Sequence, residues 1–166
     1  MADLYWCANG PMPTTAAFVP VTTGTTIKTM LQIASPATRV LRVTSWGISF
    51  DGSSAAVPIR CELLQTDVPA TVTAHVASGV QPYNDPNAPA SLVTLGVNAT
   101  GYTSTVEGAT TATRHADLQL IAPTNQYNFQ WPLDNEFQVP TSKYLRVRVT
   151  AAVAVNCYCW VCWGEG

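Results

Sequence analysis

The stretch that most constrains the fold of this chain lies at residues 143–163. Residues 143–150 (KYLRVRVT) alternate between aliphatic side chains and side chains that are polar or aromatic. Alternation with a period of two is typical of a β-strand that buries one face. Residues 155–163 (VNCYCWVCW) are apolar on both faces, as in a strand that is covered on both sides. We therefore expect two strands that fold back on each other in an all-β domain. A second subunit is one candidate for covering the second face of the last strand.

Composition limits the partners of such a domain. Charged residues make up 11% of the 166-residue, 17.7 kDa chain, against about 25% in an average soluble domain. A largely neutral surface favours an oligomer or a component of an assembly. The net charge of −2, with scattered basic residues, argues against nucleic-acid binding. No apolar run approaches the roughly 20 residues that span a bilayer, and no signal peptide is recognisable, so we expect cytoplasmic synthesis and no membrane partner.

Shorter alternating segments predict the rest of the domain. They predict strands at residues 25–34, 39–50, 57–66, 71–77, 113–122, 127–131 and 136–139, and a further short strand at 92–97. The first three of these would form a meander. In residues 39–50 the hydrophobic phase slips near Thr44 and Ser45, which predicts a β-bulge or a switch between sheets. No segment sustains helical periodicity, so the fold class is an antiparallel β-sandwich of jelly-roll type, with an immunoglobulin-like sandwich as the alternative.

Two segments fall outside this pattern. Residues 1–24 are rich in proline and are expected to form an extended arm, which packs on its own domain or reaches a neighbouring subunit. The single domain then comprises residues 25–166. Within it, residues 78–112 form a long irregular stretch of the kind that usually serves as a binding loop. Tyr83 and Tyr102 in this loop either contact a partner or pack down on their own domain.

The cysteines do not form a convincing metal site. Cys7, Cys157, Cys159 and Cys162 supply enough thiols for zinc, but Cys157 and Cys159 share one strand face whereas Cys162 points to the other. Neighbours two apart on one strand would also form a strained disulfide. We therefore interpret them as small buried hydrophobic residues and expect no metal.

Catalytic candidates are equally sparse. His115 and Asp117 should share a strand face and could join Ser78 or Ser91 in a hydrolytic triad, but no nucleophile elbow accompanies them. The sequence therefore predicts neither an enzyme nor a bound cofactor.

The remaining charged residues have structural interpretations. Asp134 and Glu136 form the nearest pair of carboxylates, and a solvated turn or an intersubunit salt bridge explains both of them. Arg42, Arg146 and Arg148 lie on strand faces, where they either face solvent or line a subunit contact.

Three segments resemble a known group of proteins. Residues 42–52 (RVTSWGISFDG), the loop 76–89 and the end at 137–165 resemble the small all-β virion proteins of tailed bacteriophages, in particular head decoration (cement) proteins of phages that infect actinobacteria. The resemblance implies a jelly roll that forms a homotrimer on the outer capsid surface, where it would tie copies of the major capsid protein together without a cofactor. Tail and baseplate proteins, and carbohydrate- or ligand-binding jelly rolls, are the alternatives.

Aromatic residues are the expected contacts with such partners, because aromatic side chains are enriched in protein interfaces. The candidate partner-binding residues are Tyr5, Trp6, Tyr83, Tyr102, Tyr158, Trp160 and Trp163.

Overall fold

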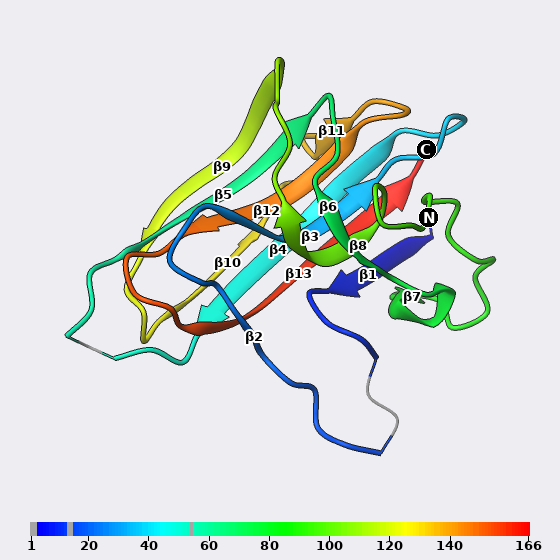
Figure 1. Cartoon of the computed structure of the whole chain (residues 1–166). Helices are drawn as coiled ribbons and strands as arrows, with labels where there is room; N and C mark the ends of the chain where they lie inside the picture. The colour runs from blue at the N-terminus through cyan, green and yellow to red at the C-terminus, as the bar shows by residue number, and fades with distance from the viewer. Residues whose placement is uncertain (1–2, 13–14, 54) are drawn as a thin grey trace.

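The computed structural model describes residues 3–12, 15–53 and 55–166, and it shows two antiparallel sheets packed face to face (Figure 1). Strand is the main secondary structure of the described chain, and its one helical element is the single 3-10 turn η1 (Ala77–Gly79). The prediction of an all-β sandwich is therefore confirmed.

The first sheet is called the β13 sheet after its central strand. It runs in the order β10-β4-β13-β1-β7, with β11 also pairing with β4 and β2 with β13. Its strands are β1 (Leu4–Ala8), β2 (Val21–Thr22), β4 (Leu41–Phe50), β7 (Val80–Pro82), β10 (Gln126–Gln130), β11 (Phe137–Val139) and β13 (Asn156–Glu165).

The second sheet is called the β12 sheet, and its order is β6-β8-β3-β12-β5-β9. Its strands are β3 (Lys28–Ala34), β5 (Ile59–Thr66), β6 (Thr71–Ala74), β8 (Gly101–Val106), β9 (Thr113–Ile121) and β12 (Tyr144–Thr150). The strand β9 forms one edge of this sheet.

The connections between strands cross from one sheet to the other. β3, β4 and β5 alternate between the sheets, so the expected meander is wrong. β12 and β13 also lie in different sheets, so the expected pairing of the last two strands with each other is wrong as well. Crossing connections of this kind are typical of Greek-key sandwiches and jelly rolls. Sequence alternation identifies a strand but not the sheet that it joins.

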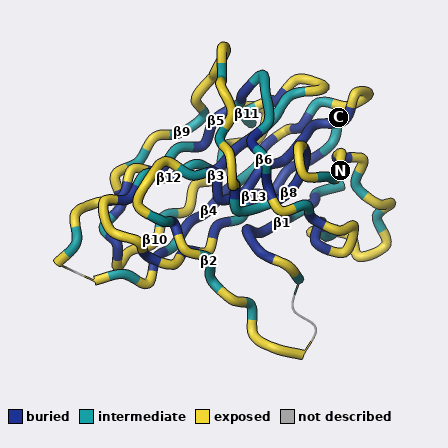
Figure 2. The backbone as a smooth tube through the Cα atoms, in the orientation of Figure 1, coloured by how far each residue is buried: buried dark blue, intermediate teal, exposed yellow. Residues whose placement is uncertain are grey.

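The core lies between the sheets and follows the alternation. Leu145, Val147 and Val149 of β12 are buried there, opposite the inward residues of β13 such as Cys159 and Val161. Figure 2 shows burial concentrated in the central strands of both sheets, with many exposed residues along β9 and the connecting loops. Each central strand therefore has one face committed to the core.

A β-bulge explains the change of phase in β4. Cys162 pairs with Ser45, but Trp163 pairs with Val43, which leaves Thr44 as the extra residue. The predicted bulge is confirmed. It allows the apolar residues on both sides of Thr44 to face the same core, since the extra residue restores their orientation.

The two irregular segments contain more strand than the sequence indicates. Residues 4–8, assigned above to an extended arm, form the internal strand β1 between β13 and β7. The stretch 78–112 contains β7 and β8, whereas residues 92–97 form only isolated bridges. Both strands of this stretch are short, so their alternation is too brief to recognise.

Candidate interaction surface

The structure separates the seven aromatic candidates into groups. Tyr5 is 3% exposed and Trp163 is fully buried, and their rings lie 6.3 Å apart in the core. Neither residue can reach a partner, so both leave the set of candidates. Tyr102 is half-buried against the imidazole of His75, at a centroid distance of 4.8 Å. Tyr83 is 64% exposed, and its backbone N–H donates to the carbonyl of Leu4 in β1.

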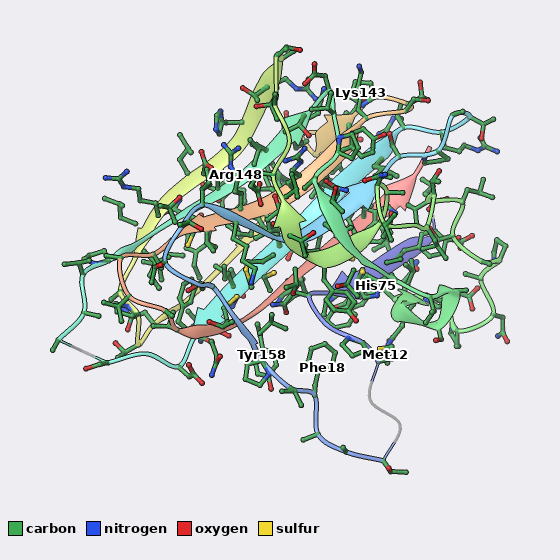
Figure 3. The ribbon with its side chains drawn as sticks, viewed as in Figure 1. Met12, Phe18, His75, Lys143, Arg148 and Tyr158 are labelled. Atoms are coloured by element: carbon green, nitrogen blue, oxygen red, sulfur yellow. The ribbon has the colours of Figure 1, made fainter. Side chains whose placement is uncertain are left out.

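The other three candidates gather on the outer surface of the β13 sheet. Trp6 comes from β1, and Tyr158 and Trp160 come from β13. Phe18 packs on Tyr158 with a centroid distance of 5.6 Å, and the Tyr158 hydroxyl donates to the carbonyl of Phe18 (Figure 3). We call the residues Trp6, Ala8, Phe18, Tyr158 and Trp160 the aromatic face. With Ala17 and Cys159 they line a groove of about 510 Å³.

Gly47 of β4 provides a seat for Trp160. A Cβ atom at Gly47 would lie 2.6 Å from Cε2 and 2.7 Å from Cζ2 of the Trp160 indole, and it would also collide with the Asn128 amide. The indole therefore occupies the space of a missing side chain and lies across β4. Only glycine permits this close approach, so the sheet fixes the position of the ring.

The surroundings of the aromatic face are polar but uncharged. Strand register places three rows of side chains across the outer surface. The rows are Gln130, Ser45, Cys162, Trp6 and Gln81; Asn128, Gly47, Trp160 and Ala8; and Gln126, Ser49 and Tyr158. None of these residues carries a charge, so a partner pays little desolvation cost for ionised groups here.

The part of the outer surface of the β12 sheet around Arg146 is covered by the chain itself. Arg146 of β12 is fully buried, and its guanidinium donates to the carbonyl of Glu107 (3.0 Å) and to the carbonyl of Val68. The Glu107 carboxylate lies 3.6 Å from Nη1. Burial lowers the pKa of Arg146, which the nearby Glu107 charge partly opposes. Arg146 therefore neither faces solvent nor lines a subunit contact, and both sequence interpretations of it are wrong.

Gln32 of β3 holds a second part of this cover. Its amide nitrogen donates to the carbonyls of Ala70 (3.2 Å) and Ala99 (2.7 Å), and its amide oxygen accepts from the backbone N–H of Ala70 (2.8 Å). Buried loop backbone needs such partners. Gln32 and Arg146 together tie the loop before β6 and the segments on both sides of β8 onto the sheet.

Arg148 and Arg42 remain accessible in the described chain. Arg42 is exposed at the start of β4. Arg148 donates from Nε to the Glu62 carboxylate at 2.7 Å, and His115 contacts the same carboxylate at 3.1 Å. Partial burial alone would raise the pKa of Glu62, but the hydrogen bonds from Arg148 and His115 lower it below its usual value.

A second β-bulge separates two members of the hypothetical triad. His115 pairs with Leu64 and Asp117 with Leu63, so Ala116 is the extra residue and the two side chains point to opposite faces of β9. The prediction that His115 and Asp117 share a face is therefore wrong.

Asp117 instead has a structural role under the sheet. Its carboxylate accepts hydrogen bonds from the Trp46 indole (3.1 Å) and the Tyr127 hydroxyl (2.9 Å). Burial and this hydrogen bond raise the pKa of Tyr127 to about 12. Ser91, one of the two serines considered for the triad, donates to the carboxylate of Glu165.

The cysteines are buried free thiols, and their orientations match the prediction. Cys157 and Cys159 face the core, and Cys162 points to the outer surface. Burial raises the pKa of Cys61 to about 12 and raises that of Cys7 as well. Among the described residues, no three His, Cys, Asp or Glu side chains are placed to hold a metal ion.

The described part of the chain contains no helix that is long and apolar enough to cross a membrane. No family model, curated protein or solved structure matches this chain.

Proposed function

We propose that this chain is a structural virion protein, a decoration protein that assembles as a homotrimer on the outside of a phage head and binds the major capsid protein. The observation that supports this proposal is the aromatic face. Trp6, Tyr158 and Trp160 converge there from two strands on a fixed sheet surface. Tryptophan and tyrosine dominate the energetics of protein interfaces.

The rigid seat of Trp160 favours association. A side chain that is already held by Gly47 loses less conformational freedom on binding than a mobile one. A trimer would also bind several capsid subunits at once, so weak individual contacts would add up through multivalency. Stabilisation of the shell then requires bound area and no chemical step.

The first experiment is light scattering of the purified protein, which should give three times 17.7 kDa. Tyr158→Ala combined with Trp160→Ala should abolish the trimer and leave the circular dichroism spectrum unchanged. Phe129→Ala is the matched control, because Phe129 and Tyr158 are both 39% exposed but Phe129 lies outside the aromatic face. A wild-type monomer, or a trimer that survives the double substitution, would contradict self-association through this face.

The second experiment is co-sedimentation with shells assembled from the major capsid protein of the same phage. Wild-type protein should pellet with these shells, and the double variant should remain in the supernatant. Binding to isolated tails rather than to shells would favour the tail or baseplate alternative.

A specific observation also favours a second candidate, a carbohydrate-binding module. The Trp160 indole lies over Gly47 beside the Asn128 amide, and the electron-rich face of an indole attracts the polarised C–H groups of a sugar ring. Neutral amides nearby can bind hydroxyl groups. A monomer that binds neutral polysaccharides, and loses them with Trp160→Ala, would support this candidate, whereas a blank glycan array would count against it.

A further inference from the structure

The edge strand β9 carries an exposed pair of leucines. Within the described chain β9 pairs only with β5, so its other side is an open sheet edge. Leu118 is 60% exposed and Leu120 is 72% exposed. Both leucines border a hollow of about 390 Å³ that also contains Arg60, Glu62 and Arg148. Open edges with apolar side chains are templates for pairing with another strand.

The backbone of this edge is oriented for pairing. The N–H of Leu118 donates to the side-chain carboxylate of Asp117 at 2.8 Å, so it points away from β5. In an antiparallel pair the direction of these groups alternates with a period of two. The N–H and C=O groups of Leu118 and Leu120 therefore face the open edge, whereas those of Gln119 face β5.

Only half of β9 is available. The bulge at Ala116, the charged side chain of Arg114 and the imidazole of His115 lie in its first half. Bulges and charges are devices that prevent pairing at sheet edges. The free half is residues 117–121, in which the two leucines are placed symmetrically around Gln119.

We propose that residues 117–121 of β9 pair antiparallel with the same residues of a second copy, about a two-fold axis at Gln119. Leu118 then lies opposite Leu120 of the second copy, and Leu120 lies opposite its Leu118. Each of these pairs exchanges two backbone hydrogen bonds, and the Asp117 carboxylate releases the Leu118 N–H. A two-fold contact of this kind closes on itself and joins two β12 sheets into one.

Charge complementarity supports a second copy as the occupant. Arg60 lies beside Leu120, and Glu62 lies beside Leu118, on the same surface of the sheet. Across the two-fold axis, the row Arg60–Leu120 continues into Leu118 and Glu62 of the second copy. The second row repeats this order in reverse, so each row carries one arginine and one glutamate. Three strand spacings separate the backbones of this arginine and this glutamate by about 14 Å. Their long side chains extend over the leucines and shorten this distance.

This contact is distinct from the aromatic face, which belongs to the other sheet, and it does not depend on the proposed function. The test therefore uses the Tyr158→Ala, Trp160→Ala double variant as its background, where any residual association comes from elsewhere. Light scattering of this background at high concentration should approach twice 17.7 kDa. Leu118→Lys with Leu120→Lys should return the mass to that of a monomer.

Cysteine cross-linking tests the register. Gln119 faces itself across the axis in a pair without hydrogen bonds, where Cα atoms lie about 4.5 Å apart, within the range of a disulfide. Gln119→Cys should therefore form a disulfide-linked dimer under mild oxidation. Leu120→Cys alone should remain uncross-linked, because its partner is residue 118, and Leu118→Cys with Leu120→Cys should cross-link again. The native cysteines are buried and should not compete.

Arg60→Glu is a milder substitution, for the case that the two lysines prevent folding. Arg60 makes no ion pair within the described chain, so this change should leave the fold intact and weaken the dimer several-fold through repulsion from Glu62 of the second copy. Absence of a Gln119→Cys cross-link, or equal cross-linking by Leu120→Cys alone, would overturn the proposal. A wild-type protein that forms no trimer but still gives the Gln119→Cys cross-link would overturn only the proposed role of the aromatic face.

Discussion

The two outer surfaces of this sandwich differ in how their central side chains are covered. The outer surface of the β12 sheet buries Arg146 and Gln32 beneath loops of its own chain. The outer surface of the β13 sheet presents Trp6, Tyr158 and Trp160 beside a groove. The covered surface depends on polar contacts that need complete pairing, whereas the aromatic face is apolar and tolerates loss of a contact. Substitutions on the covered surface should therefore change stability, and those on the aromatic face should change association.

The largest effect is expected for Arg146→Leu. This change leaves the carbonyls of Val68 and Glu107 without their charged donor, and it leaves the Glu107 carboxylate without its cationic partner. Breaking a buried ion pair in this way costs about 3–5 kcal/mol. Urea denaturation should show the loss, and Arg148→Leu is the control, for which about 1 kcal/mol is expected because its ion pair with Glu62 is partly exposed. Equal losses in both variants would mean that the cover contributes little.

A smaller loss is expected for Gln32→Leu. The leucine has a similar size but leaves backbone groups of Ala70 and Ala99 unpaired in a buried site. Such groups cost about 1–3 kcal/mol in unfolding free energy. Gln126→Leu on the exposed β10 should change stability by less than about 0.5 kcal/mol, and the same denaturation experiment compares the two directly. Similar values would remove the distinction between the surfaces.

Gly47→Ala should affect the aromatic face without removing an aromatic residue. The new methyl group would displace the Trp160 indole from the sheet, and overpacking of this kind costs about 1 kcal/mol or more. We expect a red shift of tryptophan fluorescence and a loss of association that exceeds the loss of stability. Ser49→Ala, one row away on β4, should change neither. Retained association in Gly47→Ala would show that the seat of the indole is unimportant.

The smallest effect is expected from a change of pH. It acts through His75, which follows β6 and contacts β1. His75 is 4% exposed, and its Nε2 donates to the carbonyl of Ala8 at 2.8 Å. Burial lowers the pKa of His75 below its usual 6.5, despite the opposing effect of this hydrogen bond. The unfolded chain then binds more protons below about pH 6.5, so stability should fall as the pH drops from 7 toward 5. His75→Gln should flatten this part of the stability profile, and an unchanged slope would exclude His75 as its cause.

The sequence predicts the elements of this fold better than their partners. Alternation in residues 143–150 identifies β12 and its buried face, and the change of phase near Thr44 identifies a bulge. Pairing is decided by contacts between distant segments, which alternation in one segment does not contain. This is why β12 and β13 are assigned to one hairpin from sequence, although they lie in different sheets.

The candidate surface is only partly visible in the sequence. The sequence does not show whether an aromatic residue of a strand faces inward or outward. Tyr5 and Trp163 are therefore grouped with Trp6 and Trp160 until the register is known. Gly47 carries the one local signal that could have helped, a glycine inside a strand, which often marks close approach of another group. Arg146 has no such signal, because its cover comes from loops remote in sequence.

The pairing of β1 with β13 also has a consequence for synthesis of the protein. Leu4 lies opposite Gly164, so a strand that leaves the ribosome early must wait for a partner that is translated some 160 residues later. Until then the aromatic face does not exist, because its residues come from both strands. A chain whose translation stops before β13 cannot display this face, and recruitment through it would admit only molecules that contain both strands.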